Sequence, residues 1–577
     1  MGRPLRGMVV PRATRCRQPA APPTSACGCA AFAGLDVVGW SKRTKTEGKR
    51  EAMKRVVIVG GGASGLMAAI GAARTAQEAG QACEVVVLEQ AERVGKSILA
   101  TGNGRCNVSN ARPAAALYRG SGYVGGVYAE LAGRARNRRG PFSQVKASLH
   151  EDPVHALFAS LGLVLCEEAE GRLYPATFKA TTVLDVLRAA LDAAGAVVRT
   201  DAAAVAVERA DGGASSAASA SRERSAAALE RTAATPARGL HAEAVAAAGA
   251  AARRPWRVRL ADGSVVGADA VVVAVGGKGV GALELPLVAD AAPPVPVLGP
   301  LAVRQAGRTK SLDNNRVRCR AWLFEPAREE GSRHASGPKS GKSPDKRTLE
   351  PCEREARQAA REQLSREAGV VCTAPALRDE AQRVKACEAG EVLFRRYGVS
   401  GIAIFNLSRL ARPGDELVLD LLPHVRACDC DSFLFRRRKL LAAQFGTVTY
   451  VDLLRGMLLD PVAREVARTA QVRLDDVVRK DRLADVGRTL KRWSFEVTGI
   501  GDVRQCQLTR GGVPTSAMDA RLGGVRGMDG LYVTGEALDV DGPCGGYNLH
   551  WAWASGLLAG MDAASSVLSV QADGGEA

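Results

Sequence analysis

A glycine-rich turn directly after an apolar run is the feature that most constrains the fold of this chain. The run spans residues 56–59, and Gly60, Gly62 and Gly65 follow it in the spacing G-x-G-x-x-G. The first glycine of such a turn permits a tight bend, the second lets a pyrophosphate approach the backbone, and the third lets helix and strand pack closely. An apolar helical segment begins at Leu66, and its first N–H groups can face the pyrophosphate. We expect a dinucleotide-binding βαβ unit.

A second apolar run at residues 85–88 ends in Glu89. An acidic side chain at the tip of the second strand accepts hydrogen bonds from a ribose, which favours FAD or NAD over a cofactor with a 2′-phosphate. Strand, turn, helix, second strand and acid occur in the order that the unit requires. This order makes the pattern more specific than a lone group of glycines.

Strand and helix signals recur at both ends of the chain. A strand at 270–275 runs into Gly276 and Gly277, and a strand at 531–534 precedes a helix at 547–561. A Rossmann core at both ends with a different middle predicts an α/β fold interrupted by a second domain. We divide the chain into a disordered or mis-started N-terminal extension (1–52), a first part of the cofactor-binding domain (53–294), an insert domain (295–497) and a C-terminal part of the cofactor-binding domain (498–577).

Two stretches lack the large apolar residues of a core. Residues 209–254 are rich in Ala, Ser and Arg, and residues 326–388 are polar and charged. We interpret both as flexible surface insertions. The first separates strand-like runs at 203–208 and 256–260, so it extends a predicted hairpin.

Charge and cysteine usage bound the partners of the chain. The net charge is +18, of which residues 1–52 carry +7 (ten basic and three acidic side chains), and the remainder shows no basic stripe with interleaved aromatic residues. Nucleic acid is therefore not the favoured partner. The 14 cysteines form no disulfide or zinc-like framework, which favours a reducing cytoplasm. No apolar segment reaches the roughly 18–20 residues that span a bilayer. The sequence carries no signal for an oligomeric state.

A second strand–loop–helix junction lies near the C-terminus. Its loop contains Gly535, Glu536 and Asp541, and Gly545 and Gly546 precede the helix. Glycines at a helix start expose backbone donors that suit the N1/O2 edge of a flavin, and carboxylates after the strand suit ribityl hydroxyls. A glycine-rich helix cap on an ordinary α/β domain would explain the glycines but not the acidic cluster beside them. We therefore favour a flavin.

Six segments of the chain resemble the BaiN/YhiN-like flavoproteins, also labelled NAD(P)/FAD-dependent or aminoacetone-oxidase-family enzymes. They lie at 60–70, 88–110, 171–187, 390–409, 509–514 and 530–556, and the GRCN and GGYNL motifs are the most distinctive. The resemblance implies a glutathione-reductase-type FAD domain interrupted by an insert with a β-barrel part and a helical part. Together with the two glycine-rich junctions it gives the following expected FAD-binding residues: Gly60, Gly62, Ala63, Ser64, Gly65, Glu89, Lys96, Gly102, Asn103, Gly104, Arg105, Cys106, Asn107, Gly276, Gly277, Gly535, Glu536, Asp541, Gly545, Gly546, Tyr547, Asn548 and Leu549.

The chain departs from the family pattern on the substrate side. Ser97 stands where a second basic residue is usual, the segment around Arg396 lacks the usual T-H-x-G-x-S-G-P, and His550 replaces the usual glutamine. The expected catalytic residues are His550, Arg105, Lys179 and Arg396, with Arg172 as a further substrate-facing candidate. Each has a competing structural or surface interpretation. His550 lies in the first turn of a helix, whose positive end would lower its pKa and keep it neutral near pH 7.

No metal site is expected. His150 and His155 are close in sequence, but we identify no acidic or cysteine residues as further ligands for them. Cys106 has no resolving cysteine nearby and is interpreted as a buried thiol.

The sequence therefore predicts an FAD-dependent oxidoreductase. Only one complete dinucleotide fingerprint is present, so NAD(P)H would be a transient donor. The resemblance implies reduction of an activated C=C bond in a small, steroid- or enone-like molecule. Two alternatives stay open, namely an amine oxidase that uses oxygen and a flavin-bearing RNA-binding or regulatory protein.

Overall fold

The computed structural model describes residues 53–143, 152–210, 254–287, 292–326, 383–521 and 523–569. The predicted N-terminal extension at 1–52 lies outside the described residues, as does most of each predicted insertion. Residues from Met53 onward form one compact unit.

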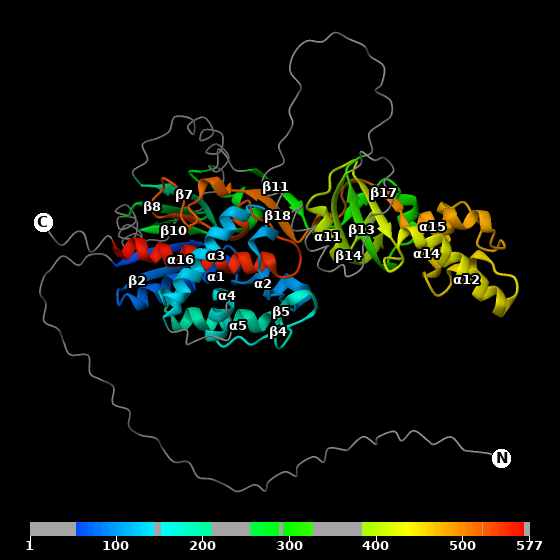
Figure 1. The fold of residues 1–577 in the computed structure, drawn as a ribbon. Coiled ribbons are helices and arrows are strands. Elements are labelled where there is room, and N and C mark those ends of the chain that lie inside the picture. The colour runs from blue at the N-terminus through cyan, green and yellow to red at the C-terminus, as the bar shows by residue number, and fades with distance from the viewer. Residues whose placement is uncertain are drawn as a thin grey trace, which may run out of the picture. The chain divides into compact units, whose positions relative to one another are not determined.

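Five parallel strands form the central sheet, in the order β19-β10-β1-β2-β6 (Figure 1). Strand β1 lies in the middle of this order, and its Val57 pairs with Val86 on one side and Val271 on the other. Val57 and Val271 are fully buried and Val86 nearly so, as expected for a parallel sheet that is covered on both faces. The Rossmann fold predicted from the glycine-rich turn is confirmed. The strands are β1 (Lys54–Val59), β2 (Cys83–Leu88), β6 (Val197–Arg199), β10 (Ala270–Val273) and β19 (Leu531–Val533).

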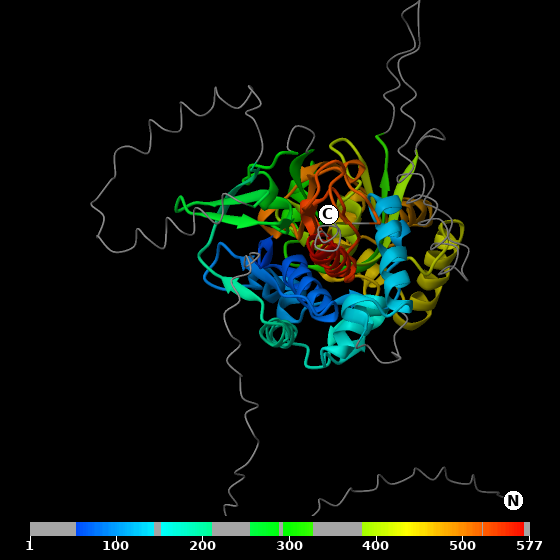
Figure 2. The same ribbon diagram turned by 90° about the vertical axis from the view of Figure 1, so that its left-hand side faces the viewer.

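Helices α1 (Ala63–Glu78) and α16 (Tyr547–Ser569) run side by side across the sheet, as both ribbon views show (Figures 1 and 2). Their close approach requires glycine. A Cβ at Gly556 would lie 2.2 Å from the carbonyl oxygen of Ser64, and one at Gly560 would lie 2.0 Å from that of Ala68. The first and last parts of the chain are thereby packed into one core.

Smaller elements surround this core. Strands β7 and β8 pair antiparallel, as predicted, and the amide of Ala210 donates to the carbonyl of Pro255 at 2.8 Å at the end of the hairpin. The first insertion therefore leaves the domain from a hairpin tip. The elements are α2 (Lys96–Ala100), β3 (Ser109–Asn110), α3 (Ser121–Arg136), α4 (Pro153–Ser160), β4 (Leu165–Glu167), β5 (Arg172–Pro175), α5 (Ala180–Ala193), β7 (Ala204–Arg209), β8 (Trp256–Leu260), β9 (Val265–Ala268), α8 (Gly276–Val280), β11 (Ala292–Val297) and β18 (Leu508–Gly512).

The middle of the chain forms a closed barrel, in the order β12-β15-β14-β13-β16-β17. Leu323, Phe394 and Trp493 fill its core. The barrel confirms the β-barrel part that the family resemblance implies. Strand β14 begins inside the predicted insertion 326–388, because residues from Val384 onward pair with β13. The strands are β12 (Leu301–Val303), β13 (Arg316–Phe324), β14 (Val384–Arg395), β15 (Gly398–Ser400), β16 (Glu416–Asp420) and β17 (Trp493–Ile500).

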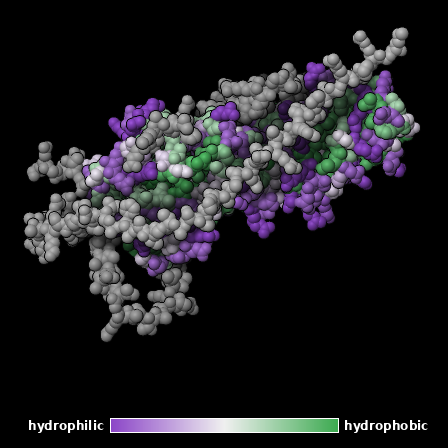
Figure 3. Space-filling view, turned by 90° about the horizontal axis from the view of Figure 1, so that it is seen from below, coloured by the Kyte–Doolittle hydropathy of each residue, from purple (hydrophilic) through white to green (hydrophobic). Residues whose placement is uncertain are grey.

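A helical part packs against this barrel (Figure 1). Its helices are α9 (Ala306–Ser311), α11 (Ile402–Ser408), α12 (Cys430–Phe445), α13 (Tyr450–Leu454), α14 (Asp460–Thr469) and α15 (Leu483–Lys491). Polar residues cover much of the described surface on the face drawn in Figure 3, with apolar residues between them in small groups. Among the helices described, none combines the length and the apolar character that a bilayer crossing requires. We keep 295–497 as the proposed extent of the insert domain.

Candidate functional site

The turn between β1 and α1 is shaped as a cradle for a small group. A Cβ at Gly60 would lie 2.5 Å from the carbonyl oxygen of Ala274, and one at Gly65 would lie 1.8 Å from that of Gly60. A Cβ at Gly62 would meet a single atom within 4 Å, the hydroxyl of Ser97 at 3.4 Å. Gly60 and Gly65 therefore serve close packing, whereas Gly62 faces open space.

Backbone donors surround this open space. Gly62 is the N-cap of α1, and no side chain caps the helix. The first N–H groups of a helix have no intrahelical partner, and they carry the positive end of its dipole. The cradle therefore suits an anionic group such as a pyrophosphate. Ala63 and Ser64 form the first turn of α1 beside it.

Glu89 lies next to the same turn, at the end of β2. Its Oε2 accepts a hydrogen bond from the amide of Gly61 at 2.8 Å, and its Oε1 accepts one from the amide of Ala91 at 2.8 Å. The two amides fix the orientation of the carboxylate at the place where the fingerprint expects a ribose.

The ends of β10 and β19 bring two further predicted segments to this turn. A Cβ at Gly535 would lie 2.6 Å from the Ser64 hydroxyl, and one at Gly277 would lie 3.1 Å from the carbonyl oxygen of Glu536. Glu536 accepts a hydrogen bond from the amide of Thr509 at 2.7 Å, and burial raises its pKa to about 7. Ligands of open α/β sheets bind at the carboxyl ends of the strands, which is where these segments lie.

The loop at 102–107 bends through a series of left-handed residues. The φ angles are +56° at Gly102, +54° at Asn103, +81° at Gly104 and +54° at Cys106. The first three residues are exposed, whereas Cys106 is fully buried, and burial raises the pKa of its thiol to about 11. A protonated, buried thiol fits the structural role expected of Cys106.

Asn107 connects this loop to the start of α16. With its amide oriented to satisfy the surrounding groups, its oxygen accepts from the amide of Gly546 at 2.9 Å, and its nitrogen donates to the carbonyl of Ser109 at 2.9 Å. A Cβ at Gly546 would lie 2.1 Å from that same carbonyl oxygen. The carbonyl of Gly545 accepts from the Asn110 side chain at 3.1 Å. The double glycine therefore packs directly against β3.

Arg105 lies over two aromatic rings on the same side of the domain. Its guanidinium carbon is 4.3 Å from the ring centre of Tyr174 and 5.0 Å from that of Phe178, and Nη2 is 2.6 Å from Oε2 of Glu168. Lys179 follows Phe178 directly and is exposed. These contacts bring the side chain of Arg105 next to the start of α5, where Lys179 is the N-cap.

The other basic residues predicted for the site either lie away from Arg105 or form ion pairs with nearby acidic residues. Arg396 lies in the β14–β15 turn of the barrel, its side chain is 72% exposed, and its Nε is 3.9 Å from Asp313. Arg172 pairs with Glu170, and Lys96 pairs with Glu92 at 3.3 Å on the surface. The described contacts do not bring Arg396 together with Arg105 or Lys179.

His550 is buried and turned toward α4. Its side chain is 1% exposed, its Nδ1 is 2.9 Å from the hydroxyl of Ser109, and its Nε2 is 3.6 Å from Oδ2 of Asp152. Burial, rather than the helix dipole that we expected, lowers the pKa of His550 to about 4. The ring is thus neutral near pH 7, but this placement does not present it to a substrate.

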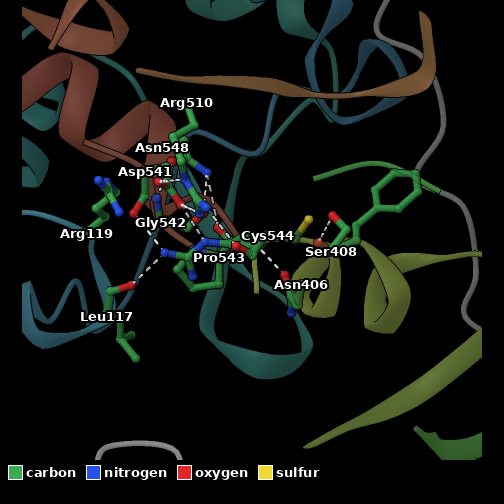
Figure 4. A network of polar contacts seen from close by, with 12 residues as sticks. Leu117, Arg119, Asn406, Ser408, Arg510, Asp541, Gly542, Pro543, Cys544 and Asn548 are labelled. Carbon is green, nitrogen blue, oxygen red and sulfur yellow. Dashed lines mark hydrogen bonds and ion pairs between the residues drawn. The ribbon is translucent and has the colours of Figure 1, made fainter. Parts of the chain in front are cut away.

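Asp541 does not offer its carboxylate to ribityl hydroxyls as predicted (Figure 4). Its side chain is fully buried, and two arginines occupy both oxygens: Arg409 Nε donates to Oδ1 at 2.7 Å, and Arg510 Nε donates to Oδ2 at 2.8 Å. Burial alone would raise the pKa of Asp541, but the two guanidinium groups outweigh it and hold the pKa well below its usual value. The prediction is corrected, because this carboxylate is fully buried and directed at two arginines, whereas Glu89 stays partly exposed.

Asn548 shapes the loop before α16 (Figure 4). Its Oδ1 accepts from the amide of Gly542 at 2.7 Å, and its Nδ2 donates to the carbonyls of Gly542 and Pro543 at 2.9 and 3.2 Å. The carbonyl of Tyr547 accepts from the Tyr118 hydroxyl at 2.7 Å, and Leu549 packs against the main core. These three residues support the loop and position its backbone.

Comparison with known proteins identifies the family. The family model described as the HI0933-like protein Rossmann domain matches residues 54–562. The chain belongs to the HI0933-like family.

Relatives of this HI0933-like protein include two enzymes with named reactions. It is 28% identical to the 3-dehydro-bile acid delta(4,6)-reductase of Clostridium scindens over 526 residues, which cover 89% of this chain and 99% of the relative. It is 32% identical to the ribosomal RNA dihydrouridine synthase of Escherichia coli over 171 residues, which cover 30% of this chain and 42% of that relative. Among solved structures, THI4 of Thermovibrio ammonificans matches at 16% identity, over 40% of this chain and 58% of the other, with a TM-score of 0.19.

The HI0933-like protein is an FAD-dependent oxidoreductase. The structure fits FAD, because an uncapped helix N-terminus faces open space at Gly62 and a carboxylate lies beside it at Glu89. The cofactor would be held by these groups and by the glycine-rich segments at 276–277 and 535–536. When bound, FAD supplies the redox chemistry, and the protein supplies position and electrostatics.

Sequence reasoning missed three residues of this HI0933-like protein. Arg409 and Arg510 lie within segments that carry the family resemblance, 390–409 and 509–514, and that membership was the available signal. Asp152 is the N-cap of α4, with Oδ1 accepting from the amides of Val154 and His155 at 2.9 and 3.0 Å. An acid before Pro153 signals a helix start, but nothing in the spacing signals its proximity to α16.

Proposed function

We propose that this protein transfers a hydride from NAD(P)H through FAD to an activated C=C bond of a small organic molecule. The observation that carries the proposal is the match to the bile acid reductase, which spans 99% of that relative and therefore includes the insert domain as well as the Rossmann core.

The reactions in the relatives' names support the same bond type. A delta(4,6)-reductase acts on ring double bonds, and dihydrouridine is uridine in which a ring C=C bond has been saturated. In both rings the double bond is conjugated with a carbonyl group, which makes its distant carbon able to accept a hydride. An enone is therefore the simplest test substrate for this chain.

The residues of this chain have distinct tasks under this proposal. The first turn of α1 and Glu89 bind the cofactor, and the loop at 102–107 covers it. Arg105 is the proposed partner of the substrate carbonyl, since its guanidinium group lies over Tyr174 beside that loop and its side chain is 42% exposed. Lys179 is proposed as a second, more exposed cation next to it. Arg396 is proposed only for substrates that reach the barrel.

Anaerobic reduction tests the donor and the acceptor separately. The purified flavoprotein is mixed with NADH or NADPH without oxygen, and the loss of flavin absorbance is followed. We expect bleaching with at least one nicotinamide and recovery of the oxidised spectrum when an enone is added. Bleaching by an amine with release of peroxide in air, and none by either nicotinamide, would instead favour the amine oxidase.

A ribosomal RNA substrate is a second candidate, favoured by the match to the dihydrouridine synthase. The match covers less than half of that relative, so the observation is weaker. Binding of ribosomal RNA fragments at increasing salt, followed by assay for dihydrouridine, tests it. A phosphate-dominated interaction weakens steeply with salt, whereas recognition of a small enone does not.

A further inference from the structure

Two histidines and an aspartate meet in the interior between α4 and α16. The ligand-capable atoms of Asp152, His155 and His550 all lie within 4.8 Å of one another. Nε2 of His550 is 3.6 Å from Oδ2 of Asp152, and Nδ1 of His155 is 3.7 Å from Oδ1. This cluster contradicts our expectation that His155 lacks acidic company, because α4 begins at Asp152 and α16 supplies a second imidazole.

The far nitrogens of both rings share one hydroxyl. Nε2 of His155 is 2.7 Å from the Oγ of Ser109, and Nδ1 of His550 is 2.9 Å from the same oxygen. That hydroxyl has a single proton and is also 3.2 Å from the carbonyl of Asn110. At least one of the two rings must therefore donate its own N–H to Ser109.

A neutral ring that donates to Ser109 turns a lone pair toward the carboxylate. A neutral imidazole carries one N–H, so the nitrogen on the Asp152 side of that ring is an acceptor. If Ser109 donates to Asn110, both rings donate their N–H groups to Ser109. Where the ring is neutral, lone pairs of nitrogen and carboxylate oxygen then face each other, and such a contact is repulsive unless a proton or a metal ion lies between the atoms.

We propose that Asp152, His155 and His550 bind a divalent cation that favours imidazole and carboxylate ligands, with Zn²⁺ as the best match. Ligand atoms of a tetrahedral zinc site lie about 3.3 Å apart, given Zn–N and Zn–O distances of about 2.0–2.2 Å. The 3.6 and 3.7 Å separations run to different oxygens of Asp152, and the three ligand atoms all lie within 4.8 Å of one another, so side-chain movement brings one oxygen and both nitrogens to a common ion. Water on the exposed side of Asp152, whose side chain is 20% exposed, completes the coordination.

Ser109 acts as the outer partner of both ligands. Metal-bound histidines usually donate their second N–H to a nearby acceptor, which fixes the tautomer and the ring orientation. Ser109 is fully buried and performs this task for both rings. The chain therefore contains the ligands and the group that orients two of them.

The ion would join α4 to the first turn of α16. His550 lies four residues after Gly546, and its amide donates to the Gly546 carbonyl at 3.0 Å. A bound ion thus holds the helix start that packs against β3. This is a structural role, so it does not depend on the reaction proposed above.

Cobalt and zinc binding to the full-length flavoprotein test the site. The protein is stripped with a chelator and titrated with Co²⁺, whose visible absorption reports tetrahedral coordination. Zinc content is measured after dialysis against Zn²⁺. We expect about one bound ion per chain and a higher Tm with Zn²⁺. No stoichiometric binding by the wild type would overturn the proposal.

Matched histidine variants locate the ion. His550→Gln restores the residue usual in the family, His155→Gln removes the second ligand, and His424→Gln changes an exposed histidine of the insert domain. We expect Co²⁺ affinity to fall roughly tenfold or more in the first two and to stay unchanged in the third. Flavin content checks that each variant folds. Ser109→Ala keeps all three ligands and should weaken binding without abolishing it. Unchanged affinity in both ligand variants would place the ion elsewhere and refute the assignment.

Discussion

Nε of Arg409 donates to Oδ1 of Asp541 at 2.7 Å, which connects the end of α11 to the loop that precedes α16. Arg510 completes the contact from β18, and its Nη1 also donates to the carbonyl of Arg409 at 2.7 Å. One buried carboxylate therefore fixes three segments that are far apart in sequence. Among these is the glycine-rich loop that we expect beside the flavin, so its position depends on a residue of the insert domain.

Asp541→Asn should destabilise the protein by about 3–5 kcal/mol, because it leaves two buried guanidinium groups without their charge partner. The free energy of unfolding, or the apparent Tm, measures the loss. Asp481→Asn is the control, since it breaks a solvent-exposed pair with Arg479 and should leave the stability almost unchanged. Equal losses in both variants would contradict the role of Asp541.

The stability difference between the wild type and Asp541→Asn should depend on pH. The pKa of Asp541 in the folded protein is lowered below its ordinary value of 3.8. The unfolded chain thus takes up the proton first as the pH falls, so the stabilisation is complete well above pH 3.8 and is lost below it. The stability advantage of the wild type over Asp541→Asn should shrink in acid.

Gly62→Val should give folded protein that lacks flavin. A Cβ at this position meets only the Ser97 hydroxyl at 3.4 Å, so the apoprotein accommodates it, but the side chain fills the cradle at the start of α1. Gly133→Val, where a Cβ meets nothing within 4 Å, is the matched control and should keep its flavin. Flavin per chain after purification is the measurement. Full flavin content in folded Gly62→Val would show that the turn at the start of α1 does not bind the cofactor.

Gly65→Ala separates packing from cofactor binding. Its Cβ would lie 1.8 Å from a carbonyl oxygen of the backbone, which cannot move aside without opening the turn. We therefore expect poor folding rather than a folded apoprotein. A well-folded Gly65→Ala protein without flavin would show that Gly65, like Gly62, acts in cofactor binding rather than in packing.

The stability of Asp562→Asn relative to the wild type should rise as the pH increases from acid to neutral. Oδ1 of Asp562 is 2.7 Å from Nη2 of Arg134, but Oδ2 has no hydrogen-bond partner among the described residues, and burial raises the pKa from 3.8 to about 7. Between these values the folded protein holds a proton that the unfolded chain has released. Wild-type stability therefore falls as the pH rises from about 4 to 7, whereas asparagine does not titrate.

The measurement is the difference in Tm between the wild type and Asp562→Asn at several pH values. The difference cancels the titration of groups that both proteins share. We expect it to shift in favour of the variant by an amount equivalent to a few kcal/mol across this range. A difference that does not change with pH would mean that Asp562 stays ionised.

Residues 211–253 should be dispensable for flavin binding. The hairpin is already closed at Ala210 and Pro255, so an Asn-Gly turn can replace the segment. Shortening a long loop changes the free energy of unfolding only modestly. A deletion that extends to 207–258 removes the buried Val207 and Val258 and should prevent folding. Loss of flavin from the shorter deletion would show that the segment contributes to the site.

The sequence determined the local part of this protein. Gly65 packs against the carbonyl of Gly60, and Gly60 packs against the residue that follows the adjacent strand β10, so the spacing of the glycines predicted the turn, the helix and the parallel sheet. The strand-like runs at 203–208 and 256–260 predicted the hairpin at β7 and β8. Glu89 was predictable because the end of a paired parallel strand has a fixed position beside the turn.

Only the tertiary structure decided the environment of the buried polar residues. Asp541 and His550 lie in a segment that the family motif assigns to the cofactor, yet one is enclosed by Arg409 and Arg510, and the other lies against Ser109 and Asp152. Whether a carboxylate or an imidazole faces a ligand depends on which distant elements pack against it. That packing brings together residues between 31 and 441 positions apart, and no local pattern of charge or hydropathy records it.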